Sequence, residues 1–307
     1  MTFTLFLVIK RRDTMEFSSQ IIQLLFSGLT IGSIYALIAI GFVIIYNVTG
    51  VLNLAQGEFA MFGAFICISL VKMGLPLWAA VILSIMMVFL IGGLFERVAI
   101  YPARKASVPT LIIITIGVSI AFRGIALLIW GTQPQSLQPF TDNTPIKFLN
   151  AVLLPQNIWA IGISLVSLVV MFYLFNKTFI GKALTACVVN QFAARLMGIK
   201  PEKMSLLAIS TSAGLGALAG IVIAPISGAS YDMGMMIGLK AFVAAVVGGL
   251  TNVPAAIGGA FLIGILESFA EGLWSSGLKD VVSFSLLLII LFVKPEGIFA
   301  KASGKRV

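Results

Sequence analysis

Glu267 and Glu271 are the residues whose spacing comes closest to a catalytic arrangement. They lie four positions apart in an apolar stretch, and side chains at this spacing share one face of a helix. Paired carboxylates can hold a metal ion or divide acid and base roles. However, the sequence contains no histidine, and neither Cys67 nor Cys187 has neighbours at metal-binding or redox spacing. We therefore predict no catalytic residue, no metal site and no cofactor.

An ATP-binding site of its own is also not expected in this chain. No G-x-x-x-x-G-K-[ST] sequence is present, because Gly181-Lys182 is followed by Ala183 and no glycine lies five positions earlier. Neither H-E-x-x-H nor G-x-S-x-G stands out. The sequence thus argues against an enzyme.

A short polar motif, Asn53, Gln56, Gly57 and Glu58, interrupts a long apolar region. On a helix the first three would share one face, and a carboxylate near a membrane span is costly unless it faces protein or water. The motif is either a structural cap or inter-helix hydrogen bond, or it lines a solute path or an internal hinge. The glycine and the cost of Glu58 favour a role beyond packing, so all four residues are candidates for a translocation path.

Isolated charges in apolar segments give further candidates. Arg123 lies toward the outer end of its apolar segment, where it can snorkel to the membrane surface. Lys240 begins a short apolar segment, either at an interface or on a transport path. We place Lys240 and Glu267 with the translocation-path candidates.

These residues must be positioned by membrane helices. The chain is 60% apolar and 10% charged, with a mean hydropathy of +1.11, outside the range of soluble domains. Its apolar runs are uninterrupted, unlike the alternating pattern of β-barrels, and each span needs about 20 residues. We predict an all-α integral membrane protein, a polytopic bundle of eight or nine transmembrane helices. The nine expected spans are 20–46, 51–72, 75–96, 108–130, 157–176, 204–226, 238–251, 253–274 and 280–296.

The net charge of +9 reports orientation rather than a nucleic-acid partner. With nine crossings and the N-terminus outside, the inner loops hold three, five and four Lys or Arg residues, twelve in all; six lie outside and two within spans. This fits the positive-inside rule, with the C-terminus inside. Three of the outer six lie in residues 1–14, an N-terminal extension that need not be native, followed by one transmembrane domain over 15–307. If 238–251 is re-entrant there are eight crossings, but the basic C-terminus would then face outward.

The segment 177–203 is too polar to span the membrane. Gly198 suits a helix C-terminus, and Phe192, Leu196 and Met197 offer apolar contacts beside small residues. The segment either lies on lipid headgroups or docks to a partner, and the apolar contacts favour docking. We expect Gly198 to end the helix and Ala194 to lie against the partner.

In this order, the segments resemble the permeases of bacterial branched-chain amino acid ABC importers, which take up leucine, isoleucine and valine. The matching motifs are GSIYALIAIG at 32–41, LAQGE at 54–58, ERVA at 96–99, PAR at 102–104, GKA at 181–183 through GI at 198–199, KAFVAAVVGG at 240–249 and KDVVSF at 279–284. They cover nearly all of 20–299.

The resemblance implies a permease subunit of the inner membrane, with 177–203 as the cytoplasmic coupling helix. The expected ATPase-coupling residues are Ala186, Asn190, Gln191, Ala193, Ala194, Arg195, Gly198 and Ile199. Val189-Asn190 departs from the family pattern, in which an acidic pair is common. The implied partners are a second homologous permease, two ABC ATPase subunits and a periplasmic or lipid-anchored substrate-binding protein, all around the lipid bilayer.

Two alternatives remain open at this point. A related ABC permease would carry urea or short amides. A self-sufficient secondary transporter would need mid-membrane carboxylates and an inverted repeat of broken helices; Glu58 and Glu267 are candidates, but no convincing repeat is found.

Overall fold

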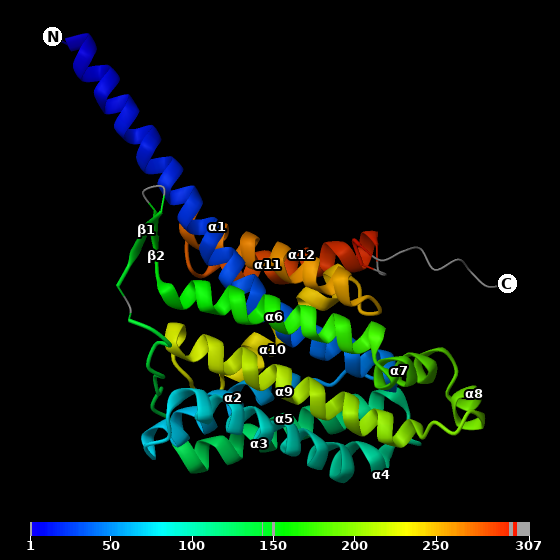
Figure 1. Cartoon of the computed structure of the whole chain (residues 1–307). Helices are drawn as coiled ribbons and strands as arrows, with labels where there is room; N and C mark the ends of the chain where they lie inside the picture. Colours follow the sequence, from blue (N-terminus) through cyan, green and yellow to red (C-terminus); the bar gives the residue numbers. More distant parts are fainter. Residues whose placement is uncertain (1, 143, 149–150, 295–296, 300–307) are drawn as a thin grey trace.

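The computed structural model describes the backbone of residues 2–142, 144–148, 151–294 and 297–299, and the side chains of 19–142, 144–146, 152–294 and 297–299. The side chains of the predicted N-terminal extension and the basic residues Lys301, Lys305 and Arg306 lie outside these ranges. The first part of α1 projects beyond the rest of the bundle (Figure 1).

Most of the described chain is helical, which confirms the predicted all-α class. The helices are α1 Thr2–Thr49, α2 Gln56–Lys72, α3 Leu77–Phe95, a π-helical turn Glu96–Ile100, α4 Tyr101–Ala103, α5 Val108–Trp130, α6 Pro155–Lys177, α7 Phe179–Val189, α8 Gln191–Leu196, α9 Pro201–Ser227, α10 Met233–Gly248, α11 Val253–Leu273 and α12 Leu278–Val293. Between α5 and α6, the strands β1 Ile146–Phe148 and β2 Ala151–Leu153 pair antiparallel, with Ile146 opposite Leu153. This hairpin lies between the predicted spans 108–130 and 157–176.

Proline sets the start of several helices. Proline occupies the first turn of α5, α6, α9 and α11, where its missing N–H has no intrahelical partner to lose. Pro76 directly precedes α3, close to its predicted start. The second predicted span, 51–72, begins late: Gly50 has φ +71° and α2 starts only at Gln56.

The core surrounds the middle of α1, where every residue from 32 to 45 is buried. This helix packs against α6, α9, α10 and α11. In the most apolar part of Ser19–Thr49, 89% of residues are buried, against 17% for α5. The outer helices therefore present apolar side chains outward, as lipid contact requires.

Small residues let the central helices approach closely. A Cβ at Gly220 would overlap the Ala60 carbonyl oxygen, and a Cβ at Gly264 would overlap the Gly32 backbone. The contacts of α9 with α2 and of α11 with α1 are therefore nearly backbone to backbone, the arrangement that small residues permit in membranes.

A helix lies at each of the nine predicted span positions, but in the described ranges only six are long and apolar enough for a full crossing. These are Ser19–Thr49, Leu77–Ala103, Val108–Trp130, Pro155–Lys177, Pro201–Ser227 and Val253–Leu273. The other three, α2, α10 and α12, contain 17, 16 and 16 residues, fewer than the roughly 20 of a typical span.

Candidate functional site

Asn53 lies in the turn that leads into α2, before the helix begins. The prediction that Asn53, Gln56 and Gly57 share a helical face is therefore wrong. Instead, Asn53 Oδ1 accepts a hydrogen bond from the Ala55 N–H (3.1 Å), and its carbonyl accepts one from the Gln56 N–H (3.1 Å). Local side-chain hydrogen bonding of this kind competes with helix and holds the turn.

Gln56 and Gly57 make the packing contacts that the sequence left open as the structural alternative. Gln56 Nε2 donates to the Ser212 carbonyl (3.0 Å), and Ser212 Oγ donates to Gln56 Oε1 (2.9 Å), which joins α2 to α9. A Cβ at Gly57 would overlap the Gly234 carbonyl oxygen and lie 2.7 Å from the Gly238 Cα. The first turns of α2 and α10 therefore lie against each other.

Glu58 is fully buried in the first turn of α2, where a negative charge offsets the helix dipole. Ser119 Oγ donates to its Oε1 at 2.8 Å, and Arg123 Nε lies 3.4 Å from the same oxygen. Arg123 also donates to Met235 Sδ (3.2 Å). It thus turns into the protein instead of reaching the membrane surface. Two lone charges of opposite sign in apolar segments were the signal for this pair.

Lys240 belongs to a second network of charged and polar side chains. Its Nζ lies 3.1 Å from Glu267 Oε1 and 2.7 Å from Asp280 Oδ1. Tyr35 donates to Glu267 Oε2 (2.8 Å), and Ser283 donates to Oε1. The network links α1, α10, α11 and α12, and sequence reasoning missed Tyr35, Asp280 and Ser283 as partners.

The two glutamates of α11 do not form a paired-carboxylate site. Glu267 faces Lys240, whereas Glu271 lies 3.8 Å from Lys279 at a more exposed position. No group of three metal-binding side chains occurs within the described ranges. These contacts fit structural ion pairs.

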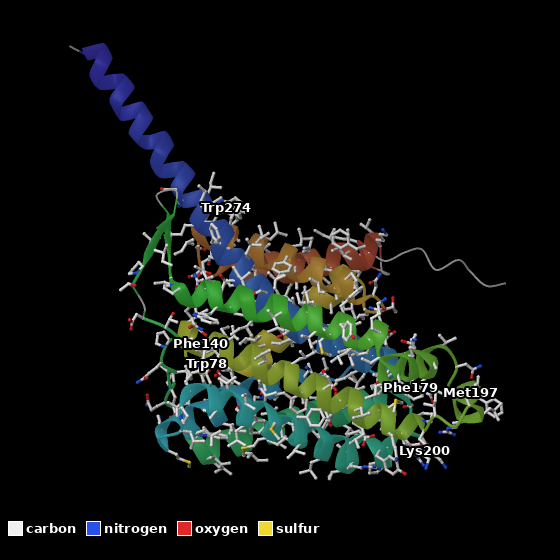
Figure 2. The ribbon with its side chains drawn as sticks, in the orientation of Figure 1. Trp78, Phe140, Phe179, Met197, Lys200 and Trp274 are labelled. Carbon is white, nitrogen blue, oxygen red and sulfur yellow. The ribbon has the colours of Figure 1, made fainter. Side chains whose placement is uncertain are left out.

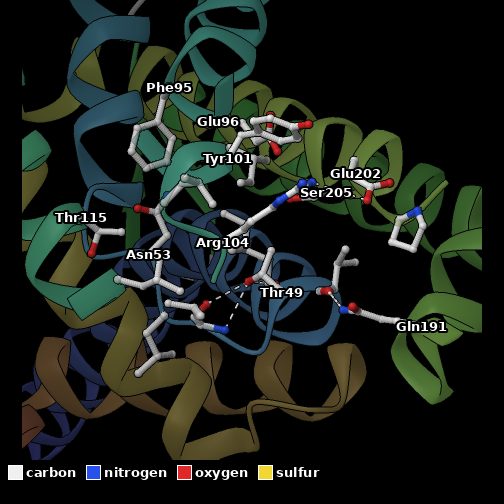
Figure 3. A pocket seen from close by; sticks show the side chains of 18 of the residues that line it. Thr49, Asn53, Phe95, Glu96, Tyr101, Arg104, Thr115, Gln191, Glu202 and Ser205 are labelled. Carbon is white, nitrogen blue, oxygen red and sulfur yellow. Dashed lines mark hydrogen bonds and ion pairs between the residues drawn. The ribbon is translucent and has the colours of Figure 1, made fainter. Parts of the chain in front are cut away.

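A cavity of about 370 Å³ lies at the end of the bundle that carries α7 and α8 (Figure 3). Parts of α1, the turn before α2, the π-helical turn, α4, α5, α8 and α9 line it. Glu202 lies 2.9 Å from Arg195 and 3.5 Å from Arg104, and the Arg104 guanidinium lies 4.4 Å from the centre of the Tyr101 ring. Of the six translocation-path candidates, only Asn53 lines this cavity.

The predicted docking segment consists of two short helices. Asn190 breaks them, and its Oδ1 accepts a hydrogen bond from the Ala193 N–H (3.0 Å) as the N-cap of α8. Gly198 ends the segment with φ +82°. Its N–H donates to the Arg195 carbonyl, and the Ile199 N–H donates to the Ala194 carbonyl, both at 3.0 Å. This is the Schellman pattern, so the predicted helix end is confirmed.

Ala194 does not face outward as expected. It is only 3% exposed, because α8 packs back against α9 on this side. Gln191 and Arg195 line the cavity, and Ala186 and Ile199 are half-buried. A bulky substitution at Ala194 would therefore disturb the segment itself and would not probe an interface with a partner.

Large apolar side chains lie on the outward face of the segment. Phe192, Leu196 and Met197 are 72%, 74% and 81% exposed, and Asn190, Ala193 and Gly198 are exposed beside them. Figure 2 shows Phe179, Met197 and Lys200 at this end, with Trp78, Phe140 and Trp274 at the opposite end. We call Phe179, Val189, Phe192, Leu196 and Met197 the end surface.

The chain is similar to known permease proteins over most of its length. The family described as "Branched-chain amino acid transport system / permease component" matches residues 24–291. The chain is 31% identical over 302 residues to the high-affinity branched-chain amino acid transport system permease protein LivH of Escherichia coli K12, covering 93% of this chain and 97% of that relative. It is 32% identical to BraD of Pseudomonas aeruginosa, a permease protein of the same description, covering 93% and 98%. PsaBC from Streptococcus pneumoniae, solved in complex with Fab, is similar in fold, with a TM-score of 0.50, 14% identity, and 89% and 91% of the two chains covered.

Proposed function

The chain belongs to the family of permease components of branched-chain amino acid transport systems, and we propose that it forms the path by which branched-chain amino acids cross the membrane. The observation that carries this proposal is the family match over residues 24–291. ATP is hydrolysed by separate subunits, since the sequence has no Walker motif.

The end surface is where an ATPase subunit docks. Large apolar side chains that are exposed together usually mark an interaction site. Here they project from a segment that also carries the exposed residues Lys182 and Lys200, so the surface combines apolar side chains with basic neighbours. If the segment instead lay flat on lipid headgroups, nothing would account for the pronounced turn at Asn190, which separates α7 from α8.

The chain crosses the inner membrane nine times, with the N-terminus outside and the end surface inside. This count includes the short helices α2, α10 and α12. The arrangement of the elements in Figure 1 supports this count. The helices α4, α7 and α8 and the end of α12 lie at one end of the bundle, and the β1–β2 pair lies at the other. The basic residues of the sequence concentrate in the loops of that first end, as the positive-inside rule requires.

The working transporter contains a second homologous permease, two ATPase subunits and an external substrate-binding protein. ATP-driven closure of the ATPases switches a two-state membrane unit between outward and inward access. Gln56, Glu58, Lys240 and Glu267 each bind other side chains of the chain. They are not free to hold a solute, which supports placing solute affinity in the binding protein.

Affinity purification and reconstitution test this function. The tagged chain should retain two ATPase polypeptides, and proteoliposomes should accumulate leucine only with the binding protein outside and ATP inside. Urea, supplied in parallel, tests the amide alternative and should not accumulate. Uptake of leucine without any ATPase would instead identify a secondary transporter.

A further inference from the structure

A groove of about 360 Å³ lies between α3 and α9, apart from the cavity described above. Leu90 and Leu94 on α3, and Leu206 and Leu207 on α9, form its apolar walls. Leu90 and Leu94 are 68% and 63% exposed, so the groove opens on the outside of the bundle. Both helices are long and apolar enough to cross a membrane, and the groove therefore faces the surrounding lipid.

Gly93 keeps the floor of this groove open. A Cβ at this position would lie 3.0 Å from Ser210 Oγ and 3.6 Å from Leu206 Cδ1, so a larger side chain would fill the space between the two helices. At the neighbouring Gly92 the helices touch, since a Cβ there would overlap the Ala213 Cβ. The groove is thus a gap beside a tight helix contact.

Two exposed cations lie at the end of the groove next to α4 and α8. Arg97 lines the groove, and its guanidinium lies 5.2 Å from the centre of the Tyr101 ring, a contact that limits its motion. Lys203 precedes Leu206 and Leu207 by three and four positions on α9, so it lies on their face of the helix, one turn nearer to α8. Within the described ranges, the Lys203 side chain has no ion-pair or hydrogen-bond partner.

The nearby acidic side chains do not neutralise this end of the groove. Glu96 is buried, and its Oε2 lies 3.9 Å from Arg97 Nε, which leaves the other N–H groups of the guanidinium available to another partner. Glu202 already pairs with Arg104 and Arg195. The groove therefore ends in a patch of net positive charge.

The combination of an apolar groove and a cationic end selects one kind of ligand. A phospholipid carries an acyl chain directly beside a phosphate, and basic pockets between membrane helices bind anionic headgroups. A second copy of this chain fits less well, because a symmetric contact through this face would place like charges together. A small phosphate compound would leave the apolar walls uncovered.

We propose that the groove between α3 and α9 binds an anionic phospholipid. One acyl chain lies between the leucines of the two helices, and the headgroup phosphate contacts Arg97 and Lys203. The bound lipid fills the gap beside Gly93 and contacts the first turns of α9, which directly follow the docking segment. The site depends on the membrane class of the chain, and it is independent of the transported solute and of ATPase docking.

Native mass spectrometry of the purified full-length chain in detergent micelles tests the site. The chain is titrated with phosphatidylglycerol and, separately, with phosphatidylcholine of the same acyl chains. The first phosphatidylglycerol should bind about tenfold or more tightly than the first phosphatidylcholine, because two basic side chains each favour an anionic headgroup about fivefold. An excess of glycerol 3-phosphate, which has no acyl chain, should not displace the lipid; displacement would assign the site to a small phosphate compound and overturn the proposal.

A double variant tests the cationic end of the groove. Arg97→Gln combined with Lys203→Gln should bring the ratio of the two lipid affinities close to one. Because the ratio is measured within one variant, a general loss of stability does not change it. Lys177→Gln is the matched control: it removes an exposed cation from the end of α6, which does not line the groove, and should preserve the ratio.

A second double variant tests the apolar walls. Leu90→Ser combined with Leu94→Ser should weaken the binding of both lipids about tenfold or more and leave their ratio unchanged, because both lipids place an acyl chain there. Leu128→Ser combined with Ile129→Ser is the control, since these exposed side chains of α5 lie away from the groove. It should leave both affinities unchanged.

Equal affinity of the unaltered chain for the two lipids would overturn the proposal, and so would an unchanged ratio in the Arg97→Gln/Lys203→Gln variant. A disulfide between two copies that carry Leu94→Cys, formed in the presence of excess phosphatidylglycerol, would show that a second copy covers the groove, and would also overturn it. Because Cys67 and Cys187 are buried, such a disulfide would join the introduced cysteines.

Discussion

Replacement of Lys240 by methionine should destabilise the bundle strongly. The Lys240 side chain is 7% exposed and carries the cation shared by Glu267, at 3.1 Å, and Asp280, at 2.7 Å. Methionine fills a similar volume but carries no charge. The substitution leaves two carboxylates close together without their common counter-ion.

The expected loss follows from the burial of this network. Removing one partner of a buried ion pair costs about 3–5 kcal/mol. Tyr35 and Ser283 still donate hydrogen bonds to Glu267, and the Asp280 side chain is 38% exposed, so the lower end of this range applies. A loss of about 3 kcal/mol corresponds to a roughly 100-fold shift in the unfolding equilibrium.

Unfolding by SDS titration in mixed micelles measures the shift. Lys279→Met is the matched control, because Lys279 and Glu271 are 3.8 Å apart with side chains 37% and 44% exposed. Such exposed pairs contribute about 0–1 kcal/mol. Glu267→Gln and the Lys240→Met/Glu267→Gln double variant complete a double-mutant cycle, in which contacting residues couple by about 0.5–3 kcal/mol.

Two results would refute this reasoning. Lys240→Met could unfold at the same SDS fraction as the unaltered chain, which would mean that the lysine provides no net stabilisation. Alternatively, the effects of Lys240→Met and Glu267→Gln could simply add, which would show that the two charges do not interact.

Three further predictions concern docking, orientation and packing. Phe192→Ser combined with Met197→Ser should lower ATPase co-purification about tenfold or more, because buried anchor residues dominate interfaces. Trp274→Ser at the opposite end is the control. Full retention of the ATPase by the double variant would place docking elsewhere. Cysteines at Ser136 and Lys200 should react with an impermeant maleimide from opposite sides of the membrane, and reaction of both from outside would contradict the orientation. The background from Cys187 should be low, since burial raises the pKa of its thiol. Gly220→Val should destabilise the folded bundle by about 1–3 kcal/mol or more in SDS titration, since even its Cβ would overlap the Ala60 carbonyl oxygen. Gly117→Val is the control and should not destabilise it, because the added side chain meets open space. Equal unfolding midpoints of the two variants would mean that the α2–α9 contact is not tight.

The sequence alone determined the helical membrane class and the positions of the helices. Apolar runs of about span length can satisfy their backbone only as helices, and a helix lies at each of the nine predicted positions. It also determined local ends, such as Pro76 before α3 and Gly198 after α8, because capping depends on the backbone of adjacent residues. The resemblance to the permease family was likewise carried by short motifs along the chain.

Only the tertiary structure decided which side chains meet. Glu58 pairs with Arg123 across 65 positions, and Lys240 pairs with Glu267 and Asp280 from two other helices. Ala194 turns inward and Phe192 outward, although both are apolar and two positions apart. These outcomes depend on how helices distant in sequence pack, and the cost of a buried unpaired charge then selects among the partners that packing brings near. Local sequence fixes a helix, but not which of its faces another helix will cover.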